Sequence, residues 1–130
     1  MVILFDQFNM PDDVYEVIFA TEQQIDVAKM LIMEFKSHSG ELNKSEMSDF
    51  AIRLHDGIVI RKPVKIGLST QHKELTVSYN KRQFYDRILT PMKSMGLVDY
   101  DLYKKTYKIS ERFTKVMQKV AAMWTSESMR

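Results

Sequence analysis

The chain has 130 residues, of which 45% are hydrophobic and 28% are charged, so we expect one folded domain rather than a disordered segment. It contains no cysteine, which excludes disulfides, thiolate metal sites and a cysteine nucleophile, and no apolar run approaches the roughly 20 residues of a membrane span. The net charge of +2 hides an asymmetry: residues 1–77 carry 8 Lys/Arg against 12 Asp/Glu, and residues 78–130 carry 11 against 5. We expect a cytoplasmic protein whose C-terminal half faces a polyanion; the alternative is an uneven surface charge without a partner.

Residues 1–20 are predicted to form an N-terminal arm and a short helix, with residues 2–8 as either a short strand or part of the arm. Pro11, followed by two acidic residues, is typical of a helix start. Thr21 and Gln24 form a second capping pattern, which predicts a longer helix up to about His38. Because this helix is apolar on most sides, it belongs in the centre of a core or in a dimer interface.

A short extended link, ELN, then precedes a helix that is capped within residues 43–45 and closed by Gly57. Its apolar residues follow helical spacing and are Met47, Phe50, Ala51 and Leu54. Residues 58–77 are rich in β-branched side chains and are predicted to form a β-hairpin or an irregular excursion, with its tip near residues 69–73. The position of this hairpin stays open, and so does the role of Lys62, Lys65 and Lys73.

The next helix is predicted over residues 80–95, because Asn80 and Gln83 form a capping pattern and Gly96 provides a stop. One face is apolar and consists of Tyr85, Ile88, Leu89, Met92 and Met95. The other face is polar and basic. Pro91 lies inside this helix, so we expect a kink or a lost backbone hydrogen bond there.

Residues 97–109 are predicted to form a strand, a turn that carries Lys104 and Lys105, and a returning strand. Ser110 is a cap for a final helix over residues 110–126. A single apolar stripe runs along this helix and consists of Phe113, Val116, Met117, Val120, Ala121 and Trp124. The stripe packs either within the monomer or against a second copy.

The run MLIMEFKSHSGELNKSEMSDFAIRL, followed by NKRQFYDRILTPMKSMGLVDYD and KTYKIS, resembles the winged helix-turn-helix domains of prokaryotic, especially archaeal, transcription regulators. The resemblance covers about residues 21–124. It implies a mainly α fold with a small β-sheet (α+β): one domain over residues 1–130, with a core at residues 21–110, a wing at about 97–109 and a C-terminal helix at 110–126. The chain departs from the family at residues 58–77, where the family has a short turn. Either a β-hairpin is inserted between the second and third helices, or the second helix is misassigned.

The resemblance implies sequence-specific binding of double-stranded DNA by a homodimeric transcription regulator, with helix 80–95 in the major groove. Arginine can donate two hydrogen bonds to guanine, and glutamine can pair with adenine. The residues expected to contact DNA are Ser78, Tyr79, Asn80, Lys81, Arg82, Gln83, Arg87, Lys104 and Lys105. The first three, with the helix N-terminus, suit phosphate oxygens, and the two lysines at the turn suit the backbone or the minor groove.

An alternative is that the same fold is a protein-interaction module in a transcription, replication or segregation complex. RNA binding is the weaker alternative, because no aromatic stacking platform is evident. His38, His55 and His72 are widely spaced, and the sequence has no catalytic motif. We therefore expect no enzyme activity, no metal, no cofactor and no membrane association.

Overall fold

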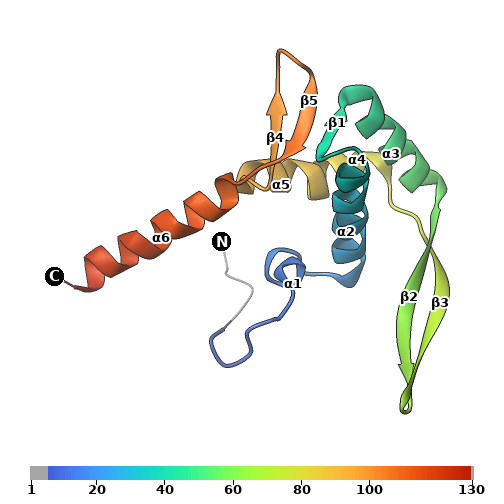
Figure 1. The fold of residues 1–130 in the computed structure, drawn as a ribbon, viewed down its shortest axis with the longest axis horizontal. Helices are drawn as coiled ribbons and strands as arrows, with labels where there is room; N and C mark the ends of the chain where they lie inside the picture. Colours follow the sequence, from blue (N-terminus) through green and yellow to red (C-terminus); the bar gives the residue numbers. More distant parts are fainter. Residues whose placement is uncertain (1–5, 130) are drawn as a thin grey trace.

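The structure is a computed structural model that describes residues 6–129 (Figure 1). It is a mixed α+β fold with two small antiparallel sheets. The helices are α1 (Val14–Ile18), α2 (Glu22–Ser37), α3 (Lys44–Asp56), α4 (Lys81–Phe84), the π-helical η1 (Tyr85–Leu89), α5 (Thr90–Met95) and α6 (Arg112–Ser128). The strands are β1 (Glu41–Asn43), β2 (Ile58–Ile66), β3 (Ser69–Val77), β4 (Val98–Asp101) and β5 (Thr106–Ile109). The part of the predicted N-terminal arm formed by residues 1–5 lies outside the described residues.

Side-chain caps set the starts of the first three helices. The α1 helix begins after Asp13, whose carboxylate accepts a backbone N–H, and not at Pro11 as expected from the sequence. The hydroxyl of Thr21 caps α2 as predicted. At α3, Asn43 and Glu46 each accept the other's backbone N–H, at 2.7 and 2.9 Å. Such caps satisfy donors that have no partner inside the helix, and each typically contributes about 1 kcal/mol.

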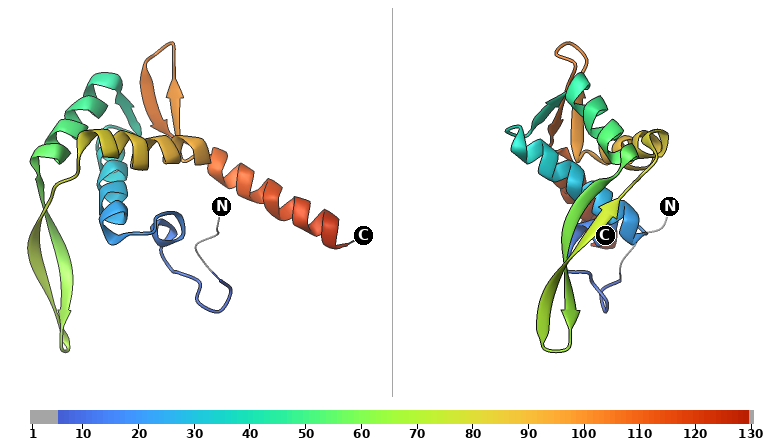
Figure 2. Two further views of the ribbon diagram at one scale, coloured as in Figure 1. Left: turned by 180° about the vertical axis from the view of Figure 1, so that it is seen from behind. Right: turned by 90° about the vertical axis from the view of Figure 1, so that its right-hand side faces the viewer.

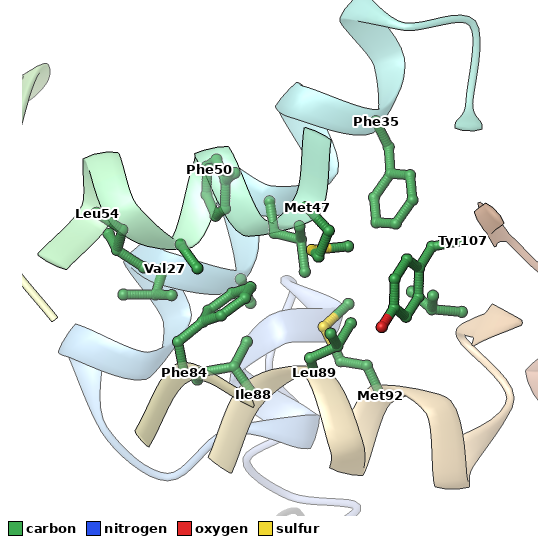
Figure 3. Packing of buried hydrophobic residues seen from close by; sticks show 14 of the residues in the cluster. Val27, Phe35, Met47, Phe50, Leu54, Phe84, Ile88, Leu89, Met92 and Tyr107 are labelled. Carbon is green, nitrogen blue, oxygen red and sulfur yellow. The ribbon is translucent and has the colours of Figure 1, made fainter. Parts of the chain in front are cut away.

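The hydrophobic core lies between α2, α3 and the continuous helix formed by α4, η1 and α5 (Figure 3). Phe50 of α3 and Phe84 of α4 pack with their ring centroids 5.6 Å apart. The predicted inner face of α3 is confirmed, since the four residues assigned to it are all buried. The core also contains the aliphatic and aromatic residues Val27, Leu31, Phe35, Leu42, Ile88, Leu89, Met92, Val98 and Tyr107.

A three-stranded sheet with the order β1–β5–β4 packs against this core. Leu42 of β1 lies opposite Tyr107 of β5, and both side chains are buried. Because β1 leads directly into α3, the pairing brings the turn of the β4–β5 hairpin next to the first turn of α3. The two strands predicted within residues 97–109 are confirmed.

The second sheet is the β2–β3 hairpin, inserted between α3 and α4 as expected from the sequence. Its register runs from Ile58 opposite Val77 to Ile66 opposite Ser69. The tip is therefore at residues 67–68, and the predicted tip at residues 69–73 is wrong. Two equal strands require the turn at their midpoint, where Gly67 takes a φ of +62°. The hairpin and the β4–β5 hairpin project in opposite directions from the helices (Figures 1 and 2).

The helix over residues 81–95 accommodates Pro91 through its π-helical segment. The N–H of Thr90 donates to the carbonyl of Tyr85, five residues earlier. Proline has no N–H, and its ring clashes with the carbonyl four residues before it in a regular α-helix. A wider, π-helical turn just before the proline accommodates both the missing N–H and the clash of the ring. The helix is therefore distorted at Pro91, as we expected.

The last helix, α6, extends away from the body of the molecule (Figure 1). It starts where the Ser110 hydroxyl accepts the N–H of Arg112 at 3.1 Å, close to the predicted cap. None of its described residues is buried. Val120 and Trp124 in the predicted apolar stripe are 52% and 69% exposed, so most of the stripe does not pack within the monomer.

Candidate nucleic-acid interface

The link that leads into α4 is anchored to the end of α3. The backbone N–H of Tyr79 donates to the carbonyl of Leu54 at 3.1 Å, and the Tyr79 side chain is only 6% exposed. The hydroxyl of Ser78 donates to the carbonyl of His55 at 3.0 Å. These bonds fix the direction in which α4 starts. The Tyr79 side chain belongs to the core, so little of its surface is left to contact a phosphate.

The first N–H groups of α4 also have partners within the chain. The Asn80 side chain accepts from Gln83 at 3.1 Å, as the capping pattern predicted. The N–H of Lys81 donates to the Nδ1 atom of His55 at 3.1 Å. Because these two donors are occupied, the helix N-terminus offers less to a phosphate than the sequence suggested, and Asn80 acts as a cap.

One face of the helix over residues 81–95 is fully available to a partner. Arg82, Gln83 and Arg87 are exposed there, and Lys81 is half-buried beside them. The opposite face is locked in the core by Phe84 and its neighbours (Figure 3). Arg82 approaches Asp86 at only 3.9 Å and both side chains are mostly exposed, so this pair restrains the guanidinium weakly.

The turn of the β4–β5 hairpin presents Lys104 and Lys105 to solvent. The carboxylate of Asp101 shapes this turn by accepting the N–H groups of Tyr103 and Lys104, at 2.9 and 3.1 Å. The same hydrogen bonds, that from Lys104 first, hold the pKa of Asp101 below its usual value. These hydrogen bonds therefore hold the turn in a defined conformation.

The start of α3 adds residues to this surface that the sequence reasoning missed. The N–H of Lys44 donates to the carbonyl of Lys105 at 3.0 Å, which joins the turn to the first residue of α3. A shallow hollow of about 400 Å³ lies at the junction and is lined by Asn43, Lys44, Ser45, Ser48, Lys104 and Lys105. Three lysines and two hydroxyls around one hollow are suited to an anion such as a phosphate. The sequence signal was the lysine and serine directly after the ELN link.

Tyr85 connects the hollow to the helix face described above. It lies half-buried beside Ser48, and burial raises the pKa of its phenol. The structure therefore brings Lys104, Lys105 and Lys44 together at one end. Arg82, Gln83 and Arg87 form a separate, neighbouring stretch along the helix.

The lysines of the β2–β3 hairpin are not equivalent. Lys62 points toward α2, where its ammonium group lies 2.8 Å from both Glu22 and Asp26. Its charge is thereby compensated within the molecule, and it does not extend a positive surface. Lys65 and Lys73 are exposed, and neither forms an ion pair within residues 6–129.

No protein-family model, curated protein or solved structure matches this chain. Among residues 6–129, no helix is long and apolar enough to span a membrane. In the same part of the chain, no group of three or more acidic or histidine side chains is placed to hold a metal ion.

Proposed function

We propose that the chain is a winged-helix protein that binds double-stranded DNA sequence-specifically, as a homodimeric transcription regulator. The order from α2 to β5 supports this assignment, since it reads helix, strand, helix, helix, strand, strand, with the β2–β3 hairpin added between the second and third helices. In this assignment the helix over residues 81–95 is the recognition helix and the β4–β5 hairpin is the wing.

The observation that carries the proposal is the two-sided helix over residues 81–95. Its inner face is held by the core, and its outer face presents Arg82, Gln83 and Arg87. Rigid placement of such side chains is what base reading requires, and a well-formed bidentate contact discriminates by roughly 1–3 kcal/mol. The lysines at the wing and at the start of α3 would neutralise phosphates beside it.

The exposed stripe on α6 supports dimerisation. A 17-residue helix gains most of its stability from packing of its apolar face, and most of the apolar face of α6 is exposed in the monomer. Its basic residues Arg112, Lys115 and Lys119 all lie in the N-terminal half, whereas its single acidic residue, Glu127, lies near the C-terminus. An antiparallel α6 pair places the basic half of one copy beside the acidic and dipole-negative end of the other.

The proposal is tested by fluorescence anisotropy of a labelled mixed-sequence duplex over a salt series. We expect the logarithm of affinity to fall linearly with the logarithm of salt, and the Lys104→Ala/Lys105→Ala variant to reduce that slope by about two. The Lys36→Ala variant removes an exposed charge on α2, away from this surface, and should keep the slope. If the folded protein does not bind the duplex at low salt, the proposal is wrong.

A second candidate function is protein recognition by the wing. Leu102 and Tyr103 at its turn are 79% and 99% exposed, and an exposed aromatic beside an aliphatic residue is typical of protein interfaces. Salt-insensitive capture of a protein partner that requires Tyr103, together with no binding to the duplex, would favour this candidate.

A further inference from the structure

The β2–β3 hairpin contributes little to the core. No residue between Ile58 and Val77 is buried, and only the base of the hairpin, at those two residues, packs against the core. A two-stranded hairpin alone is marginally stable in water. Each strand has nine paired residues and is about 30 Å long at roughly 3.3 Å per residue. Packing within the monomer therefore does not explain the length of the hairpin.

The hairpin is nevertheless held in a defined direction. Lys62 clamps it to α2 through Glu22 and Asp26, each 2.8 Å away. At the base of the hairpin, β3 leads into the recognition helix through the link at residues 78–80. This link is hydrogen-bonded to the end of α3, so α3 positions both the hairpin and that helix. The wing projects from the opposite side of the same helices (Figures 1 and 2).

Apart from Lys62, the charge of the hairpin is mainly positive. Arg61, Lys65 and Lys73 are exposed, and the only acidic residue of the hairpin is Glu74, opposite Arg61. Lys73 lies opposite Lys62, a like-charge pair that would normally repel. Compensation of Lys62 by two carboxylates of α2 relieves the repulsion and leaves Lys73 available to an external anion.

The tip carries apolar side chains. Leu68 is fully exposed, and Ile66 before it is 55% exposed. An apolar tip on a basic two-stranded ribbon matches the chemistry of proteins that place strands along DNA and insert an apolar side chain between base steps of the minor groove.

We propose that the β2–β3 hairpin is a second DNA-contacting arm, on the side of the recognition helix opposite the wing. Arg61 and Lys65 on one face of the ribbon, and Lys73 on the other, contact phosphates on its two sides, and Leu68 enters the minor groove at the end of the footprint. The inference rests on the proposed function. DNA is favoured over a protein partner because three exposed cations and one acid line the arm, which is complementary to a phosphate backbone.

The test uses the absence of native cysteine. A Leu68→Cys variant carrying a photo-crosslinker is irradiated with the mixed-sequence duplex, beside a Tyr103→Cys variant for the wing and a Lys36→Cys variant on α2. We expect crosslinks from positions 68 and 103 and none from position 36. In parallel, Lys65→Ala and Lys73→Ala should each lower the salt slope by about one, as a lost phosphate contact does.

The possible outcomes separate the two proposals. Crosslinks from position 103 alone, with salt slopes unchanged in both lysine variants, would overturn the second arm and leave the winged-helix reader intact. If the unmodified protein does not bind the duplex, both fail together. A Leu68→Ser variant that keeps its affinity but bends the duplex less, measured by end-to-end fluorescence transfer, supports the wedge.

Discussion

Gly96 is the residue at which the helix over residues 81–95 meets α6. Its φ is +84°, and a Cβ atom there would lie 2.9 Å from the backbone nitrogen of Phe113 and 3.0 Å from the Cβ of Arg112. The N–H of Phe113 donates to the Gly96 carbonyl at 2.9 Å. Gly96 therefore ends one helix and also permits the close approach that starts the next.

A Gly96→Ala variant should be destabilised by roughly 1–3 kcal/mol or more, because backbone strain and a steric clash act together. Gly40 is the matched control, since its φ is +86° but an added Cβ has no atom within 4 Å. Gly40→Ala should cost only the strain, roughly 1–2 kcal/mol. Urea unfolding of both variants measures the difference. Equal losses would mean that the contact between Gly96 and α6 adjusts without cost.

At the scale of elements, the clamp between the β2–β3 hairpin and α2 has a definite pH range. Hydrogen bonds to Asp26 and then to Glu22 raise the pKa of Lys62, and the bond to Lys62 lowers the pKa of Glu22. The stabilisation that Glu22 gives to the clamp is present above the ordinary glutamate pKa of 4.5. It is lost as the pH falls through the lowered pKa of Glu22. The stabilisation that Lys62 gives to the clamp is present below the ordinary lysine pKa of 10.5. It is lost as the pH rises through the raised pKa of Lys62.

We therefore expect the direction of the hairpin to be independent of pH between 4.5 and 10.5. Spin labels on a Leu68→Cys/Lys36→Cys variant should report one narrow distance distribution throughout this range. Adding Lys62→Met should broaden the distribution, whereas Lys65→Met, on the same strand, should not. A narrow distribution in the Lys62→Met background would show that the base of the hairpin holds it without the ion pairs.

Features that depend on residues close together in the sequence, such as helix caps, were predicted correctly. Features that depend on tertiary contacts were missed. The caps at Thr21, Asn43 and Asn80 are local, because each side chain bonds to a backbone group three residues ahead. The inner face of α3 followed equally from helical spacing. The burial of Tyr79 depends on its packing against the end of α3, which no local pattern reveals.

The same limit explains the errors in the candidate site. The acids that compensate Lys62 lie 36 and 40 residues away in the sequence. The position of Lys44 beside the wing depends on the pairing of β1 with β5. Exposure of Arg82, Gln83 and Arg87 was predictable, because an amphipathic helix with a well-marked apolar face fixes its outer face too.

At the scale of the whole molecule, the exposed apolar stripe of α6 is the surface that we expect to form the dimer interface. We expect the protein to have twice its monomer mass in light scattering, and Val120→Lys to convert it to a monomer with less helix. Gln118→Lys adds the same charge on the outer side of the helix and should remain dimeric. An unchanged mass for Val120→Lys would exclude the stripe as the interface. Ready disulfide formation between copies of a Ser128→Cys variant would contradict the antiparallel order.

The pairing of Ile58 with Val77 has a consequence for how this architecture can vary. Neighbouring strands lie about 5 Å apart, so the chain leaves the helical core and returns to it at almost the same point. The whole segment between these residues is thus a detour that a short turn can replace while α3 and the helix over residues 81–95 keep their places. The reach of the protein can then be lengthened, shortened or exchanged by changes within this one segment, without redesigning the helical core.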